Sequence, residues 1–101
     1  MNFFNNIKPP KEGEIFEELY KNESVMIEKI ISSNKQTGKL YNQNYDEWVM
    51  LMDGEATLET EGEQKVLKKG DFILIAKNSP HKVLQAKEGT LWLCVHISMN
   101  S

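Results

Sequence analysis

The sequence has little of several features that mark specialised classes of protein. Its single cysteine, Cys94, cannot form an internal disulfide, which predicts a reducing compartment and most simply the cytoplasm. No run approaches the roughly 18 apolar residues of a membrane-spanning helix, so we expect no membrane span. Residues 1–6 carry neither a basic stretch nor a long apolar one, and we expect no secretory signal there.

Clusters of basic residues are missing as well. The formal net charge is −3 and the lysines are interleaved with glutamates, whereas nucleic-acid binders present a basic patch or stripe. We therefore expect no nucleic-acid partner. The chain also lacks a Cys-x-x-Cys pair, the glycine spacing of a phosphate loop, and any spacing that favours a Ser-His-Asp arrangement.

What is present fits one small globular domain. The chain has 101 residues, of which 40% are hydrophobic and 27% are charged. This balance is typical of a folded protein rather than a disordered one. A chain of this size can bury one hydrophobic core but not two.

From Val25 onward, short apolar or alternating segments are separated by turn signals such as Asp53-Gly54. The segments expected to form strands are Val25–Ile31, Glu47–Met52, Ala56–Glu61, Gln64–Leu67, Phe72–Ala76, His81–Gln85 and Leu91–Ser98. Strands do not alternate with helices, so the pattern predicts an all-β sandwich or barrel.

The first part of the chain has a different pattern of apolar and polar residues. Residues 1–23 are expected to form an N-terminal arm and a short helix that packs on a barrel domain of residues 24–101. The helix is expected over Glu14–Lys21, because Ile15, Phe16 and Leu19 recur at helical spacings and acidic residues occupy the first turn. Such a helix is too short to be stable without packing.

Two segments resemble the two sequence motifs of the cupin family. In residues 41–54, Glu47 and Gly54 keep the six-residue spacing of the first motif, which runs His-x-His, then Glu, then Gly. In residues 70–81, a Gly-Asp turn opens a strand and a Pro-His pair ending in His81 follows a loop, as in the second motif. The resemblance covers roughly residues 25–97. It implies a small all-β, double-stranded β-helix (jelly-roll) barrel of the cupin type, with a pocket inside.

The resemblance also implies metal ligands, of which this chain keeps two, Glu47 and His81. The two histidines of the first motif fall at Tyr41 and Gln43, so that motif is degenerate. Glutamine can ligate through its carbonyl oxygen, and the expected metal set is therefore Gln43, Glu47 and His81. Imidazole and carboxylate suit zinc, iron, manganese or nickel. Whether a divalent transition metal is bound stays open.

Strand alternation gives an independent reason to group these residues. Tyr41, Gln43 and Glu47 can share a face, and in a small closed barrel one face points inward, where it can hold one small ligand. A buried carboxylate opposite the His81 imidazole needs a partner, because an unpaired internal charge is costly. Tyr41 is expected to contact the ligand. His96 has two readings: a hydrogen-bonded core or interface residue, or a further ligand-binding or acid–base group.

Two classes of function remain open at this point. One is a metal-dependent enzyme acting on a small molecule, for which the resemblance allows dioxygenase, isomerase or decarboxylase activity. The other is a non-catalytic binding or sensor module without metal, which the loss of both first-motif histidines favours. A third alternative is an unrelated β-sandwich, in which Glu47 and His81 would lie far apart on the surface.

A homodimer is expected as well. Small cupins are commonly dimers, and the apolar side chains of Phe3, Phe4 and Ile7 would be exposed on a monomer.

Overall fold

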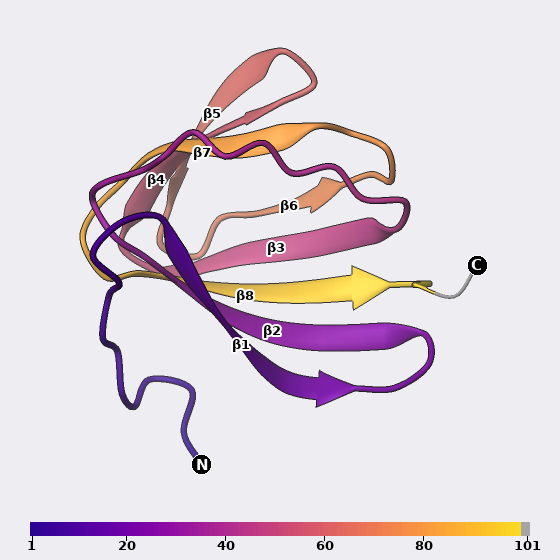
Figure 1. Ribbon diagram of the computed structural model, residues 1–101, viewed down its shortest axis with the longest axis horizontal. Helices are drawn as coiled ribbons and strands as arrows, with labels where there is room; N and C mark the ends of the chain where they lie inside the picture. The colour runs from indigo at the N-terminus through magenta and orange to yellow at the C-terminus, as the bar shows by residue number, and fades with distance from the viewer. Residues whose placement is uncertain (100–101) are drawn as a thin grey trace.

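Eight β-strands form from the segments between the turns of the chain. The computed structural model describes residues 1–99 (Figure 1). The strands are β1 (Glu14–Lys21), β2 (Val25–Ser32), β3 (Asp46–Asp53), β4 (Glu55–Thr60), β5 (Glu63–Lys68), β6 (Phe72–Ile75), β7 (His81–Ala86) and β8 (Thr90–Ile97). Every strand predicted from Val25 onward is present, with ends that differ by at most one residue. None of the residues 1–99 forms a helix that could cross a membrane.

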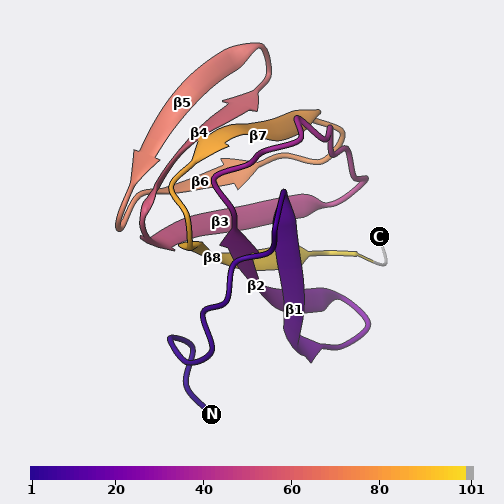
Figure 2. The ribbon, with the colours of Figure 1, turned by 60° about the vertical axis from the view of Figure 1, so that its left-hand side comes forward.

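The strands pair in two antiparallel sheets that face each other. One sheet has five strands in the order β1-β2-β8-β3-β6, and the other has three in the order β5-β4-β7. Figures 1 and 2 show the sheets curving toward each other with the interior between them. The prediction of an all-β jelly-roll barrel is therefore confirmed.

The predicted helix over Glu14–Lys21 is wrong. This segment is β1, an edge strand that pairs with β2 from Glu14 opposite Ser32 to Lys21 opposite Met26. A register shift between Glu18 and Tyr20 interrupts the alternation of side chains. Leu19 is the extra residue at this shift, so Ile15, Phe16 and Leu19 do not follow the two-residue period of a regular strand, and their spacing resembles that of a helix. A two-turn helix satisfies few of its own backbone groups, whereas β2 offers a complete ladder.

The turn between β1 and β2 carries a sequence signal that distinguishes a strand from a helix over Glu14–Lys21. The side-chain oxygen of Asn22 accepts hydrogen bonds from the backbone amides of Ser24 and Val25, each at 2.9 Å. An asparagine that bonds the backbone two and three residues ahead is typical of a tight turn. Asn22 therefore joins two strands, and the segment before it is the first arm of a hairpin.

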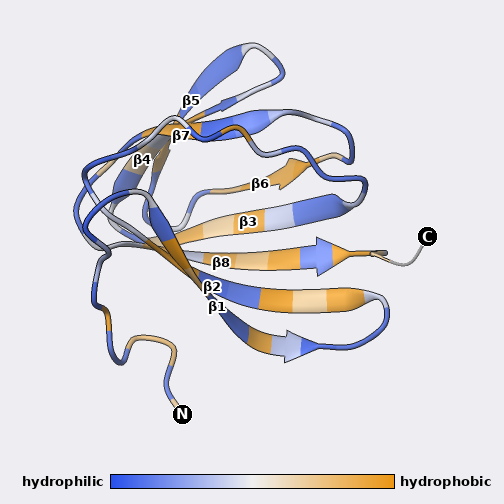
Figure 3. Ribbon diagram, viewed as in Figure 1, coloured by the Kyte–Doolittle hydropathy of each residue, from blue (hydrophilic) through white to orange (hydrophobic). Residues whose placement is uncertain are grey.

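The core lies between the sheets, and alternate side chains of β3, β4 and β8 build it. Its buried members are Val49, Leu51, Ala56, Leu58, Leu67, Ile75, Trp92 and Cys94. On β8 both faces are apolar in sequence, but the structure turns Trp92, Cys94 and His96 inward. Leu93 and Val95 occupy the outer face and are only partly buried. Figure 3 shows hydrophobic residues along much of β3 and β8.

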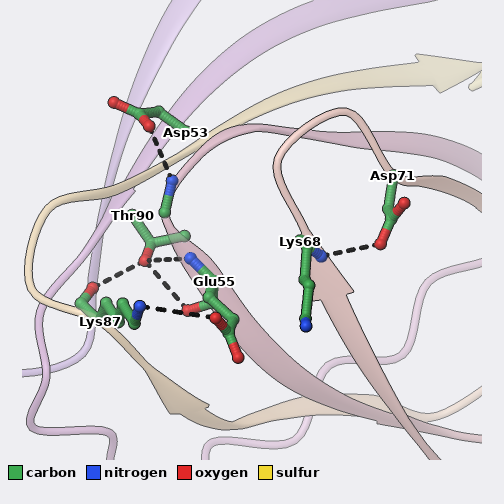
Figure 4. A network of polar contacts seen from close by, with 7 residues as sticks. Asp53, Glu55, Lys68, Asp71, Lys87 and Thr90 are labelled. Atoms are coloured by element: carbon green, nitrogen blue, oxygen red, sulfur yellow. Dashed lines mark hydrogen bonds and ion pairs between the residues drawn. The ribbon is translucent and has the colours of Figure 1, made fainter.

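The turns that follow β3, β5 and β7 meet at one end of the barrel (Figure 4). The Thr90 hydroxyl lies 2.7 Å from the Lys87 carbonyl oxygen and 3.2 Å from that of Glu55. Gly54 has φ +98°, and a Cβ on it would come within 2.9 Å of Thr90 Cα, so only glycine fits there. Asp71 accepts a 2.8 Å hydrogen bond from the Lys68 amide, which fixes the turn between β5 and β6.

The long connection from β2 to β3, residues 33–45, runs beside β7 (Figure 1). Tyr41 and His81 form an isolated antiparallel bridge, in which each backbone amide donates to the other residue's carbonyl at 2.8 and 2.9 Å. The Asn78 amide also donates to the Gln43 carbonyl at 2.7 Å. These backbone bonds bring Tyr41 and Gln43 to the start of β7, close to the first residues of β3.

Candidate functional site

A cavity of about 220 Å³ lies inside the barrel. Its polar lining residues are Glu14, Glu28, Tyr41, Gln43, Tyr45, Glu47, His81, Cys94 and His96, and its apolar lining is Phe16, Met26, Ile30, Val49, Leu58, Ile75, Val83 and Trp92. All five residues predicted for the site (Tyr41, Gln43, Glu47, His81 and His96) line this one cavity.

Glu47 and His81 form the first carboxylate–imidazole pair in the cavity. Glu47 Oε1 lies 3.6 Å from His81 Nε2 and accepts a 2.6 Å hydrogen bond from the Gln43 amide nitrogen. Both charged side chains are buried, being 8% and 9% exposed. His81 Nδ1 donates to the Ser79 carbonyl at 3.0 Å. Both the carbonyl and the carboxylate only accept, and the carbonyl is the nearer of the two, so the neutral form of this ring carries its proton on Nδ1 and turns the Nε2 lone pair toward Glu47.

Each member of this pair shifts the pKa of the other. Burial raises the pKa of Glu47, but His81, Gln43 and the field of His96 outweigh that effect, so the net pKa lies below its ordinary value. Burial lowers the pKa of His81, but Glu47 and the Ser79 carbonyl raise it above its ordinary value overall. The site therefore favours a carboxylate beside an imidazolium, which can serve as a base and an acid within reach of one ligand.

Glu28 and His96 form a second pair that the sequence analysis did not identify. His96 Nε2 lies 3.0 Å from Glu28 Oε1, and the side chains are 8% and 13% exposed. His96 Nδ1 is buried and has no hydrogen-bond partner within residues 1–99. The Tyr45 ring packs edge-on against the His96 ring at 5.3 Å between centroids. Register places His96 directly opposite Glu47 on β3, so the two pairs are neighbours.

Glu14 is a third carboxylate that lines the cavity; it is half-buried and comes from the segment that was predicted to be a helix. It accepts a hydrogen bond from the Ser32 hydroxyl, and Ser32 Oγ in turn accepts a 2.8 Å bond from Trp92 Nε1. Burial raises the pKa of Glu14, and the bond from Ser32 opposes this in part. Treating residues 14–32 as a hairpin would have placed Glu14 and Phe16 on the same inward face as Glu28.

Two further groups have restricted chemistry. Burial, with the nearby Glu47 carboxylate, raises the pKa of the Cys94 thiol well above its usual range, so Cys94 is a neutral buried thiol rather than a reactive one. Burial and the surrounding glutamates raise the pKa of Tyr41, which disfavours the phenolate that a metal ligand would need. The Tyr41 ring instead stacks on His81 at 5.9 Å between centroids.

The donor set for a metal is small. Within residues 1–99 no group of three or more His, Cys, Asp or Glu side chains is arranged to hold a metal ion. Gln43 presents its amide nitrogen to Glu47, so its carbonyl oxygen is turned away from the site that Glu47 and His81 share. Two strong donors are fewer than the three protein ligands of a typical catalytic zinc site. The residues present therefore do not fit a tightly held transition metal.

Comparison with solved structures identifies close matches of the whole fold. A Ralstonia eutropha JMP134 protein, provisionally assigned as a mannose-6-phosphate isomerase, is 33% identical over 97% of this chain and 96% of its own, with a TM-score of 0.87. An RmlC-like cupin from Desulfovibrio desulfuricans is 16% identical over 97% and 93%, with a TM-score of 0.79. KdgF from Halomonas sp. is 17% identical over 88% and 82%, with a TM-score of 0.77. The latter two show the fold alone.

No match was found among curated proteins. The family model described as cupin domain matches residues 31–96, which is more than half of the chain. Cupin domains often bind metals or small ligands and often form oligomers. The motif spacing, the jelly-roll topology and the family match agree, and the chain belongs to the cupin family.

Proposed function

We propose that this cupin binds a small organic molecule in the barrel cavity and that Glu47 and His81 exchange protons with it. The observation that carries this proposal is the cavity itself. It places a carboxylate–imidazole pair in a cavity whose accessible surface is mostly apolar, with Gln43 and Ser79 fixing both partners. A concave apolar site with a few convergent polar groups of shifted pKa is the usual form of a binding or active site.

Proton transfer is the reaction type that this pair supports. A carboxylate can remove a proton from a bound molecule, and an imidazolium beside it can return one to a neighbouring atom. The Ralstonia eutropha relative supports the same reaction class, because interconversion of an aldose and a ketose moves a proton between adjacent carbons. Where no proton is moved, the same contacts serve a binding or sensor module.

A metal-dependent enzyme is the second candidate function. One observation favours it: the Nε2 lone pair of neutral His81 faces Glu47, while Nδ1 is held by a backbone carbonyl, an arrangement common among metal-binding histidines. Gln43, Glu47 and His81 would be the protein ligands, with the Gln43 amide turned over. Mass spectrometry of metal content is expected to give well under one metal per chain. A near-stoichiometric metal that Glu47→Ala and His81→Ala both remove would establish the metalloenzyme instead.

The binding proposal is tested by nuclear magnetic resonance of the ¹⁵N-labelled protein against a panel of sugars, amines and small carboxylic acids. We expect at least one member to shift the backbone amides around Glu47 and His96. Val83→Trp narrows the cavity from β7 and should abolish the shifts, whereas the neighbouring Lys82→Trp, which does not line the cavity, should preserve them. A panel that leaves the cavity residues unchanged in the wild type contradicts the proposal.

We also propose a homodimer formed through the outer face of the five-stranded sheet. The strand register aligns Tyr20, Ile27, Val95, Trp48 and Leu74 in one row across all of its strands. At the β6 edge of this face the exposure is highest, at 62% for Phe72 and 60% for Leu74. A contiguous apolar face of this kind is uncommon on a monomer. A second copy supplies the same apolar face, as a two-fold interface requires.

Analytical ultracentrifugation tests the dimer. The wild type is expected to sediment at twice the chain mass of 11.7 kDa. Leu74→Asp should give the monomer, while Val66→Asp, at a similarly exposed position on the three-stranded sheet, should remain dimeric. A wild type that sediments only as the monomer overturns this part of the proposal.

A further inference from the structure

The wall of the cavity carries a surplus of negative charge. Three carboxylates line it (Glu14, Glu28 and Glu47), against two imidazoles and neither a lysine nor an arginine. Even with both imidazoles protonated, one carboxylate is left without a cation. Each histidine lies within 4 Å of one glutamate, His81 beside Glu47 and His96 beside Glu28. The glutamate without an imidazole partner is Glu14.

Glu14 is held in place rather than left mobile. The Trp92 indole donates to Ser32, and Ser32 donates to the Glu14 carboxylate, so a chain of two hydrogen bonds that starts in the core fixes the orientation of Glu14. Among residues 1–99 no lysine or histidine forms an ion pair with Glu14. A carboxylate that is partly removed from water and has no cation beside it carries a desolvation cost, which a cationic ligand would reduce.

The remaining wall is suited to a cation by its shape and chemistry. Phe16, Tyr41, Tyr45 and Trp92 all line the cavity. The rings of Phe16 and Tyr41 lie 6.2 Å apart between centroids, in an edge-on arrangement. Aromatic faces attract ammonium groups, and cages of such rings are the recurrent way in which proteins bind quaternary ammonium ligands.

The His96 imidazole gives an independent indication that the cavity binds a ligand. His96 is 6% exposed and lines the cavity, yet its Nδ1 has no hydrogen-bond partner in the described chain. Glu28 occupies Nε2, and because a carboxylate only accepts, the proton of the neutral ring resides there. Nδ1 is then an acceptor for a hydroxyl or an N–H group of a ligand.

From these observations, and resting on the proposed small-molecule site, we propose that the cavity takes a small organic cation that carries a hydroxyl group, such as an amino alcohol, rather than a phosphorylated sugar. The ammonium group lies against Glu14 and the aromatic rings, and the hydroxyl donates to His96.

The size of the cavity suits such a ligand, because a cavity of about 150 Å³ accommodates benzene and this one is about 220 Å³. A phosphate would meet three carboxylates at the same wall. Lys39 does not line the cavity, although its Nζ lies 5.2 Å from the centre of the Tyr41 ring.

Isothermal titration calorimetry with three probes tests this inference. Choline is the hydroxylated cation, 3,3-dimethylbutan-1-ol is its neutral isostere, and D-mannose 6-phosphate is the anion. We expect choline to bind at least about tenfold more tightly than the neutral alcohol, because cation–π attraction and the carboxylates act on the charge alone. The phosphate is expected to bind most weakly. Glu14→Gln should reduce choline binding toward that of the alcohol. Glu17→Gln, an equal charge change on the exposed side of the same strand, should not.

Equal binding of choline and the neutral alcohol overturns the inference, as does tighter binding of the sugar phosphate or the absence of choline binding. These comparisons use the wild type, so they hold even where Glu14→Gln unfolds. The proposed small-molecule site is judged separately by the panel and by Val83→Trp. A panel that finds neutral or anionic ligands in the cavity supports the site while contradicting the ligand class proposed here.

Discussion

The two carboxylate–imidazole pairs in the cavity are similar in burial but differ in how the second ring nitrogen is satisfied. Both ring nitrogens of His81 have a polar neighbour, Glu47 or the Ser79 carbonyl, whereas among residues 1–99 His96 has a hydrogen-bond partner, Glu28, at Nε2 alone. A buried polar atom without a partner is uncommon in folded proteins. The first pair is thus satisfied by the protein itself, while the second leaves His96 Nδ1 as an acceptor for the ligand that we propose for the cavity.

The largest expected difference between the pairs is in stability. His81→Leu leaves the Glu47 carboxylate without its cation and the Ser79 carbonyl without its donor, so we expect a loss of about 3 kcal/mol in the free energy of unfolding. His96→Leu removes one contact, and about half that loss is expected. Urea unfolding at pH 6 measures both. A larger loss for His96→Leu would reverse the comparison, and the double variant Glu47→Leu, His81→Leu should cost less than the sum of its single changes.

A smaller effect is expected in the dependence of stability on pH. The pKa of His81 is raised above its ordinary value of 6.5, so its stabilisation is fully present below that pH and is lost as the pH rises through the folded-state pKa. The pKa of Glu47 is lowered from 4.5, so its stabilisation is present above that pH and is lost as the pH falls through the folded-state pKa. The pair therefore contributes most between about pH 4.5 and 6.5.

The difference in unfolding free energy between the wild type and His81→Gln isolates this contribution. It should be greatest inside that window and smaller on both sides. A difference that grows steadily up to pH 9 would show that His81 does not act as the charged partner of Glu47.

The smallest effect is spectroscopic and concerns where each ring carries its proton. At a pH high enough to neutralise both rings, His81 should carry the proton on Nδ1 and His96 on Nε2, because their carbonyl and carboxylate partners only accept. Long-range ¹H–¹⁵N correlation spectra distinguish the two tautomers. Finding the same tautomer in both rings would remove the asymmetry between the pairs.

Local sequence patterns gave most of the fold but only part of the site. Glu47 and His81 were recognisable because each lies at a fixed distance from a turn, Asp53-Gly54 and Gly70-Asp71 respectively, and turns are specified locally. Glu14 was missed because the register shift in β1 imitates helical spacing. Glu28 was missed because a glutamate next to Lys29 on a strand is typical of a surface residue until its partner on the neighbouring strand β8 is known.

By itself, the sequence determined the seven strand segments from Val25 onward and the turns between them. These depend on side-chain periodicity and on residues such as Gly54, whose backbone conformation at the turn requires glycine. Only the tertiary structure decided which face of β8 points inward, because Trp92, Cys94 and His96 alternate with residues that are equally apolar. Only the pairing of β1 with β2 and the long loop beside β7 brought Glu14, Tyr41 and His81 around one cavity. Those contacts join positions far apart in the chain, and no local pattern records them.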